Sequence, residues 1–264
     1  MAQSHGIAIK KKFSQHFLRD LGVVQRMCER AKLDKTSNVF EIGCGDGVLT
    51  REILTYPIQR LWVFEIDSAW AGFVKKALPD PRMTIFVKDF LITDFAEFES
   101  HKPWILLANL PYQITFPILH TLKEQRHLLD HGIIMMQEEV AQKIMKKSGR
   151  GYGYVSLFFQ YYFEWQLLEK ISPGAFHPPP QVYSRLMYFK PRANVDPIMD
   201  EQNFWLFIKA CFKQPRRMLK NNLMQSHYDI AKIPEATLLL RAQQMNMQDF
   251  LKLWKIIKEP NKKS

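Results

Sequence analysis

Cysteine is scarce in this 264-residue sequence, and long apolar runs are missing. Cys28, Cys44 and Cys211 lie far apart and form no CxxC pair, so neither a disulfide framework nor a zinc or other metal site is expected. No run of about 18 apolar residues occurs, so we expect no membrane-spanning helix. Residues 1–12 are polar and then basic, without the apolar centre of a secretion signal, which predicts a cytoplasmic protein.

Acidic residues are too few to balance the basic ones. The net charge is +11, and it is distributed unevenly along the chain. Residues 1–190 hold 24 Lys and Arg against 19 Asp and Glu, a net of +5, whereas residues 191–264 hold 13 against 7, a net of +6. This excess in a short stretch predicts a polyanionic partner, with nucleic acid ahead of a membrane surface. A basic surface without any partner would give the same composition.

Strands and helices are predicted to alternate over most of the chain. Apolar runs predict strands at 39–42, 61–66, 83–87, 104–108 and 133–137. Helical patterns precede or separate them at 21–33, 48–54, 69–78, 115–123 and 138–147. Such alternation predicts an α/β fold, with a parallel sheet covered by helices on both faces. Two further strands, at 165–169 and 185–189, are expected to form an antiparallel edge.

The pattern changes after a stretch with the composition of a linker, residues 191–197. Short helical segments follow, with no convincing strand, at 200–212, 215–224, 234–240 and 247–258. The sequence therefore predicts two domains, an α/β domain over residues 1–190 and a small all-helical domain over residues 191–264.

A glycine-rich loop follows the first predicted strand, in the segment 39–47 (VFEIGCGDG). Its G-x-G-x-G spacing lacks the third glycine of the dinucleotide fingerprint, which disfavours a nicotinamide oxidoreductase and favours a nucleoside without a pyrophosphate. Glu65 closes the second strand, where an acid can accept both ribose hydroxyl protons. Asp89 closes the third strand, where an acid can accept from an adenine amino group. Either acid alone could be a helix cap, but both at successive strand ends favour a nucleoside site.

The residues Asn109, Leu110, Pro111 and Tyr112 follow the fourth predicted strand, where open α/β sheets place their ligand crevices. The Asn109 amide and the Leu110 carbonyl can accept the hydrogens of a nucleobase amine, and Pro111 fixes the backbone. Tyr112 can stack on the base. Phe176, in a Pro-rich segment, is predicted to be the second wall of the base site, with a core position as the alternative. A base must be flipped out or single-stranded to reach such a site.

Together these motifs resemble the ribosomal RNA adenine dimethyltransferases of the small subunit, the KsgA family. The matching segments are, in order, FSQHFL (13–18), EIGCG (41–45), Glu65, Asp89, NLPY (109–112) and FHPPPQVYS (176–184). The resemblance implies a Rossmann-like class I methyltransferase domain, S-adenosylmethionine as methyl donor, and two neighbouring adenines near the 3′ end of small-subunit RNA as substrates. It also implies a helical C-terminal domain that engages the immature small ribosomal subunit, with no membrane partner. We expect a monomer.

The resemblance also assigns a donor site. The family's donor positions fall on His16, Leu18, Gly43, Glu65, Asp89 and Asn109, and their neighbours Gln15, Gly45, Ile66 and Phe90 complete the predicted site. Two residues depart from the family pattern. His16 stands where the family often has Asn, and it can still form one hydrogen bond, so we expect the site to survive. Cys44 stands where Pro is common, and we expect a small loop residue rather than a reactive thiol.

Two other functions remain open at this point. A large-subunit adenine methyltransferase of the macrolide-resistance type would share most motifs, but Leu110 and the sequence 175–178 (AFHP) favour the small-subunit family. The second open function is that of an RNA-binding assembly factor without catalysis. The intact Glu65, Asp89, Asn109 and Tyr112 argue against it.

Basic residues gather in one predicted helical hairpin, at Lys209, Lys213, Arg216, Arg217 and Lys220. The first of them are spaced by three or four residues, so they are predicted to share a helix face that grips RNA phosphates. A solvated helix face is the alternative.

Overall fold

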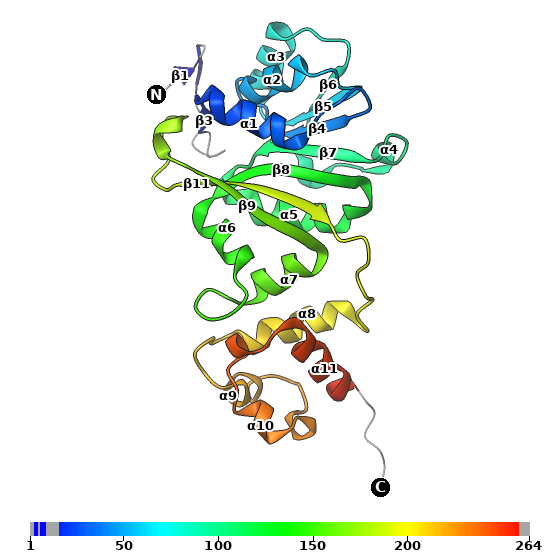
Figure 1. Ribbon diagram of the computed structural model, residues 1–264, viewed down its shortest axis with the longest axis vertical. Helices are drawn as coiled ribbons and strands as arrows, with labels where there is room; N and C mark the ends of the chain where they lie inside the picture. Colours follow the sequence, from blue (N-terminus) through cyan, green and yellow to red (C-terminus); the bar gives the residue numbers. More distant parts are fainter. Residues whose placement is uncertain (1–2, 5, 9–15, 259–264) are drawn as a thin grey trace. The chain divides into compact units, whose positions relative to one another are not determined.

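The computed structural model describes residues 3–4, 6–8 and 16–258, and the chain forms two compact units (Figure 1). The first unit contains Met1–Ala141 and Glu164–Pro191, and the second contains Gln142–Phe163 and Arg192–Ser264. The sequence predicted a single division, between residues 190 and 191. Residues 142–163 are therefore grouped with the helical unit and not, as predicted, with the α/β domain.

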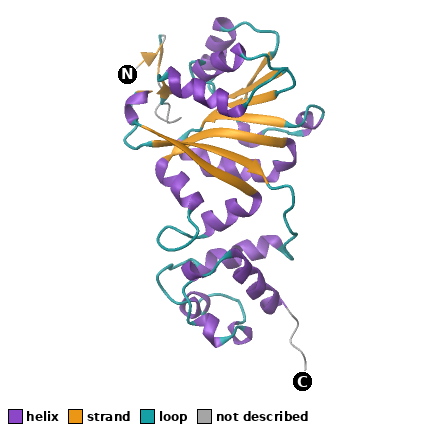
Figure 2. Cartoon of the chain, in the orientation of Figure 1, coloured by secondary structure: helices purple, strands orange, loops and turns teal. Residues whose placement is uncertain are grey.

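The first unit is built on a seven-stranded sheet with the order β6-β5-β4-β7-β8-β11-β9 (Figure 2). Its strands are β4 (Asn38–Ile42), β5 (Arg60–Glu65), β6 (Met83–Val87), β7 (Trp104–Asn109), β8 (Leu129–Gln137), β9 (Phe163–Ile171) and β11 (Ser184–Pro191). The first five pair in parallel, and β11 pairs antiparallel to β8, with Ser184 opposite Gln137. This confirms the predicted strands, and β9 and β11 lie at the predicted edge.

The central strands are mostly apolar because both faces of the sheet are covered. On one face, alternate residues such as Val39, Leu61 and Leu107 join a core with α1 (Leu21–Ala31), α2 (Val48–Thr55) and α3 (Ser68–Ala77). On the other face, Phe40 and Phe64 belong to an aromatic cluster with Phe90, Phe98 and Trp104, beside α5 (Thr115–Glu124). Side chains of a strand point alternately to the two faces, which separates these two cores.

Two short strands join segments from opposite ends of the first unit. β3 (Phe17–Leu18) pairs antiparallel with β10 (Phe176–His177), so that Leu18 lies opposite Phe176. The backbone nitrogen of Arg19 also donates to the Ala175 carbonyl at 2.7 Å. The two sequence motifs FSQHFL and FHPPPQVYS are thus neighbours in the fold, a pairing that the sequence did not predict.

The second unit is helical in its described part. Its helices are α7 (Tyr154–Tyr162), α8 (Glu201–Cys211), α9 (Leu219–Leu223), α10 (Glu235–Leu238) and α11 (Met247–Lys258), and α6 (Glu138–Met145) leads into it. Helix α7 was not predicted, and its aromatic side chains explain why it belongs here. The Phe158 ring lies 4.8 Å from the Trp205 ring, and the Trp205 indole donates to the Tyr162 hydroxyl at 2.8 Å.

The predicted helix 215–224 is wrong in its first half. α8 ends at Cys211 and α9 begins at Leu219, and a turn lies between them. The buried Asn222 side chain holds this turn, because its amide donates to the Cys211 carbonyl at 2.9 Å and its Oδ1 accepts from the Gln214 backbone nitrogen at 3.0 Å. Lys213, Arg216 and Arg217 therefore lie in a turn, and the predicted shared helix face is not formed.

No helix within the described ranges combines the length and apolarity needed to cross a membrane.

Candidate active site

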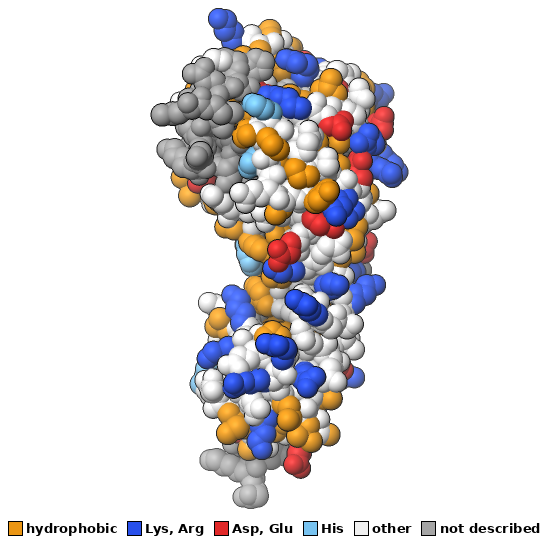
Figure 3. All heavy atoms as spheres, turned by 90° about the vertical axis from the view of Figure 1, so that its left-hand side faces the viewer, with side chains coloured by type: hydrophobic (Ala, Val, Ile, Leu, Met, Phe, Trp, Pro, Cys, Tyr) orange, Lys and Arg blue, Asp and Glu red, His pale blue; other side chains and the backbone are white. Residues whose placement is uncertain are grey.

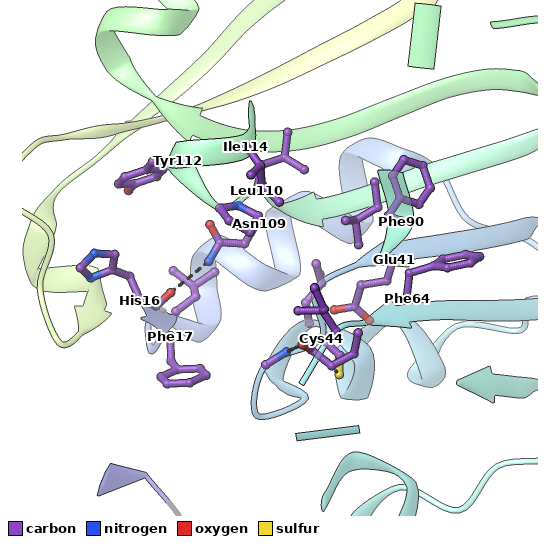
Figure 4. Close-up of a pocket in the computed structure, with 18 of the residues that line it drawn as sticks. His16, Phe17, Glu41, Cys44, Phe64, Phe90, Asn109, Leu110, Tyr112 and Ile114 are labelled. Atoms are coloured by element: carbon purple, nitrogen blue, oxygen red, sulfur yellow. Dashed lines mark hydrogen bonds between the residues drawn. The ribbon is translucent and has the colours of Figure 1, made fainter. Parts of the chain in front are cut away.

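A pocket of about 330 Å³ opens in the first unit at the carboxyl ends of β4, β5, β6 and β7 (Figure 4). This volume lies in the range of small-molecule sites. Twelve of the predicted site residues line it: His16, Leu18, Gly43, Gly45, Glu65, Ile66, Asp89, Phe90, Asn109, Leu110, Pro111 and Tyr112. Gln15 lies outside the described residues, and Phe176 does not line the pocket.

The floor of the pocket is the glycine loop after β4. Gly43 and Gly45 have φ angles of +76° and +52°, a region that residues with a side chain rarely adopt. A Cβ atom on Gly45 would also come within 3.0 Å of the Phe17 ring. The loop is tied to β5, because the Gly43 backbone nitrogen donates to the Phe64 carbonyl at 2.8 Å. A substituent at either glycine would therefore move backbone that lines the pocket.

Glu65 holds this loop from the end of β5. Its side chain is 6% exposed. One carboxylate oxygen accepts from the Asp67 backbone nitrogen at 2.8 Å and the other from the Gly45 backbone nitrogen at 3.2 Å. Burial raises the pKa of Glu65 and is only partly opposed by these two hydrogen bonds. Oε1 keeps a second acceptor position for a ligand hydroxyl, whereas Oε2 also accepts a weak bond from the Cys44 thiol at 3.7 Å, which a ligand hydroxyl would have to replace.

Glu41 is a pocket residue that we did not assign from the sequence. It lies two residues before Gly43, its side chain is 1% exposed, and the Thr50 hydroxyl donates to its Oε2 at 2.7 Å. Its Oε1 has no hydrogen-bond partner among the described residues. Burial raises the pKa of Glu41 to about 8, so the group is mostly protonated at neutral pH. A bound cation near Oε1 would favour the charged form.

Asp89 has two roles, because it caps a short helix and also lines the pocket. It lines the pocket, and its Oδ1 accepts from the Leu91 backbone nitrogen at 2.9 Å, which caps the short 3-10 helix Phe90–Ile92. The helix cap considered for Asp89 is therefore present. Its second carboxylate oxygen is not used by this cap.

Asn109 ends β7 and faces the middle of the pocket (Figure 4). Its amide Nδ2 donates to the His16 backbone carbonyl at 3.2 Å, and this bond leaves Oδ1 as an acceptor. The Leu110 backbone nitrogen is used by β8, since it donates to the Met135 carbonyl at 3.0 Å. Pro111 has a φ of −60° and precedes the 3-10 turn Tyr112–Ile114. The acceptor amide and the aromatic ring of the NLPY motif are thus fixed to the end of one strand.

Tyr112 is positioned by Ser184, the last residue of the FHPPPQVYS motif. The Tyr112 hydroxyl and the Ser184 Oγ lie 2.6 Å apart, and Ser184 is fully buried at the start of β11. Burial raises the pKa of Tyr112, so the phenol stays neutral. No local pattern in the sequence pairs these two residues, and the position of Ser184 at the end of a matching motif was the one available signal.

We expect Ser184→Ala to slow the methyl transfer that the family resemblance implies about 5- to 10-fold. A buried hydrogen bond contributes about 1–1.5 kcal/mol, and its loss would let the Tyr112 ring turn. Single-turnover rates measure the effect, and calorimetry should give an unchanged donor affinity. If Ser184 acts through Tyr112, adding Ser184→Ala to Tyr112→Phe should cause no further loss. Additive losses would contradict a positioning role.

The predicted role of Phe176 as the second wall of the base site is not met in this structure. Its side chain is 4% exposed and belongs to the apolar core that also contains Leu18 and Val24. The β3–β10 pairing turns the ring inward, which is the core position considered as the alternative. The ring therefore offers no open face to a base in the pocket.

The fold and the site define the class of this protein. A parallel sheet wound on both sides, a glycine loop after β4, acids at the ends of β5 and β6, and an acceptor amide beside an aromatic ring after β7 are the parts of a class I methyltransferase. The chain also matches the family described as ribosomal RNA adenine dimethylase over residues 6–259. It belongs to this family.

Curated relatives are similar over nearly the whole chain. The ribosomal RNA small subunit methyltransferase A of Chlorobium phaeobacteroides is 35% identical, covering 96% of this chain and 92% of that protein. The protein of the same name from Syntrophotalea carbinolica is 32% identical, covering 94% and 96%.

Solved structures share the fold at lower identity. A dimethyladenosine transferase from Plasmodium falciparum has a TM-score of 0.77 at 20% identity, covering 90% of this chain and 96% of that one. The 23S rRNA methyltransferase ErmE has a TM-score of 0.70 at 22% identity, covering 92% and 100%.

Proposed function

We propose that this protein transfers methyl groups from S-adenosylmethionine to the exocyclic amines of two adjacent adenines near the 3′ end of small-subunit ribosomal RNA. The observation that carries the proposal is the placement of Asn109 and Tyr112 beside the strand-end acids of one pocket. The small-subunit names of relatives at 32–35% identity support this substrate over the large subunit. An immature small subunit as substrate, a monomeric enzyme and a cytoplasmic location complete the proposal.

The residues of the pocket suit the donor by their chemistry. The Glu65 carboxylate can accept from the two ribose hydroxyls, and the Asp89 carboxylate can accept from the adenine amine. The buried Oε1 of Glu41, without a partner among the described residues, suits a ligand ammonium. When bound, the donor supplies an electrophilic methyl group on a positively charged sulfur.

The chain's own part in the reaction is alignment. An adenine amine is a weak nucleophile because its lone pair is delocalised into the ring. The Asn109 Oδ1 and the Leu110 carbonyl accept its hydrogens, which favours a more pyramidal nitrogen with its lone pair directed at the methyl carbon. Proximity and orientation of this kind supply about 7–11 kcal/mol in favourable cases. Asn109 and Leu110 would hold the amine so that a bound donor could supply its methyl group to the nitrogen, with the amine proton released to solvent.

A labelling experiment tests the proposal directly. The protein is incubated with labelled donor and either immature small subunits or immature large subunits, and the methylated base is mapped. We expect label on two adjacent adenines of the small-subunit RNA. Label confined to the large subunit would instead assign the macrolide-resistance type of activity. Binding to the small subunit with no transfer to either RNA would assign an assembly factor without catalysis.

We further propose that the second unit grips RNA phosphates through a basic turn, Lys213, Arg216 and Arg217, together with Lys209 and Lys220 on the flanking helices. All five side chains are exposed. Figure 3 shows Lys and Arg side chains spread over one face of this unit, with few acids among them. Because the arginines lie in a turn and not on a helix face, their side chains can follow an irregular phosphate path. Such contacts add affinity without sequence preference.

The double variant Arg216→Glu with Arg217→Glu is expected to weaken binding to small subunits and to flatten its salt dependence. Each lost phosphate contact lowers the slope of log affinity against log salt by about one unit. Donor affinity should not change. The control is Lys75→Glu with Lys76→Glu, an exposed pair in α3 of the first unit that makes the same change in net charge. If both double variants behave alike across the titration, the basic turn is not the grip, and residues 143–150 are the next candidates.

A further inference from the structure

The glycine loop after β4, residues 43–47 (GCGDG), carries two side chains, and they bond to different walls of the pocket. Its three glycines have φ angles of +76°, +52° and +80°. The Cys44 thiol donates to Glu65 at the end of β5. The Asp46 carboxylate pairs with the guanidinium of Arg19, which lies between β3 and α1. Backbone so rich in glycine loses much entropy when it is held in one conformation, so these bonds matter for its order.

Arg19 is itself fixed, so it can hold the loop. Its backbone nitrogen donates to the Ala175 carbonyl at 2.7 Å, next to the β3–β10 pairing. Its guanidinium lies over the Phe17 ring, 5.6 Å from the ring centroid, and that ring packs on Gly45. The next residue, Asp20, caps α1. Arg19 therefore joins the glycine loop to a well-anchored part of the first unit.

The two partners of this ion pair differ in their exposure. The Asp46 side chain is 3% exposed and lines the pocket, whereas the Arg19 side chain is 35% exposed and is not part of the pocket lining. Salt screens a pair with a buried carboxylate only weakly, and loss of the cation would leave an unpaired buried charge. Arg19 can therefore act on a bound ligand through Asp46 and the loop, without touching it.

We propose that Arg19 is a positioning residue for the methyl donor, which holds the glycine loop, through Asp46, in the conformation that receives S-adenosylmethionine. The inference rests on the proposed function and adds to it a residue outside the pocket lining. A loop that is already ordered avoids the entropy cost of ordering on binding. Loss of the ion pair should therefore weaken donor binding, mainly through faster dissociation.

Three variants and one control test the ion pair by calorimetry, with S-adenosylmethionine and with its product, S-adenosylhomocysteine. We expect Arg19→Ala and Asp46→Ala to weaken binding of both ligands by a similar factor, about 5- to 30-fold, because one charge-assisted hydrogen bond is lost. Arg19→Lys keeps the charge and should stay within about 3-fold of wild type. The control Arg26→Ala removes an ion pair between α1 and Glu169 that lies outside the pocket, and it should change neither affinity. Thermal unfolding identifies any variant that is misfolded.

The double variant Arg19→Ala with Asp46→Ala separates positioning from the burial of a charge. It leaves no unpaired carboxylate, so affinities as low as those of the single variants support positioning. Wild-type affinity in the double variant would assign the single losses to the unpaired charge and would overturn the proposal.

The two ligands supply a second criterion, because the donor carries a positively charged sulfonium that the product lacks. Positioning of the loop affects both ligands alike. If Asp46 instead acts on the sulfonium directly, Arg19→Ala will favour the donor over the product, since it removes the cation that neutralises Asp46. A donor preference of this kind would overturn the proposal.

Hydrogen exchange of the ligand-free protein reports the order of the loop itself. The Gly45 backbone nitrogen donates to Glu65 at 3.2 Å, and a loosened loop opens this bond more often. We expect the peptide that contains residues 43–47 to exchange faster in Arg19→Ala than in wild type or Arg26→Ala. Unchanged exchange would overturn the proposal. The proposed function fails separately, because it requires transfer to small-subunit RNA, which none of these measurements uses.

Discussion

Asn109→Ala is expected to reduce the rate of methyl transfer by about 10²- to 10³-fold, the loss typical when one fixed polar group that acts in the transition state is removed. The amide is held to the His16 carbonyl at 3.2 Å, so its Oδ1 is aimed before the base arrives. Alanine removes this acceptor and also the bond that ties the end of β7 to the segment containing His16. A single-turnover assay with saturating donor and immature small subunits measures the effect.

Donor affinity is the control for this variant. Asn109 lines the pocket near the donor side as well, so calorimetry should show a donor affinity reduced by less than 10-fold. A fall in donor affinity as large as the fall in rate would mean that Asn109 binds the donor and does not act on the amine. Unchanged transfer would exclude the proposed mechanism.

Glu65→Ala is expected to weaken donor binding about 10- to 100-fold. A charge-assisted hydrogen bond contributes about 1.5–3 kcal/mol, and the ribose diol would lose its acceptor. The change also frees the Gly45 backbone nitrogen, which now donates to Glu65 at 3.2 Å, so the glycine loop should loosen in the same variant. Calorimetry with the donor measures the affinity.

A matched variant separates this effect from a general loss of negative charge. Glu97→Ala removes an exposed acid of the first unit that lies outside the pocket, and it should leave donor affinity unchanged. Equal affinities for wild type and Glu65→Ala would remove Glu65 from the donor site.

The sequence predicted well which residues at the strand ends line the pocket, for a physical reason. β4, β5 and β7 are covered on both faces, so each is a recognisable apolar run with a clear carboxyl end. Parallel strands place those ends at one edge of the sheet, which brings together residues such as Glu65 and Asn109 without any knowledge of the loops. Glu41 was missed because nothing in the sequence distinguishes an acid within a mostly apolar strand from an ordinary residue of that strand.

The base side was predicted less well because it depends on contacts between distant segments. Phe176 looks like a stacking residue in sequence, yet its pairing with Leu18 turns the ring into the core. The bond between Tyr112 and Ser184 joins residues 72 positions apart and has no local pattern. In the second unit, the helix predicted over 215–224 was shortened by a buried side chain, Asn222, that holds the preceding turn.

The side chains of His16 and Tyr112 are both bonded to the segment around Pro178 and Ser184. This arrangement also sets the order in which parts of the site can form while the chain is synthesised. Residues that line the pocket end at Ile114, whereas the bond from His16 to Pro178 closes a loop of 162 residues. Closing a loop of this size requires the later segment to have left the ribosome, and it costs the conformational entropy of joining the two ends of the loop. Because Leu18 lines the pocket and pairs with Phe176, a nascent chain cannot complete the pocket before this later segment has emerged. While it emerges from one ribosome, it has no finished site with which to modify the RNA of another.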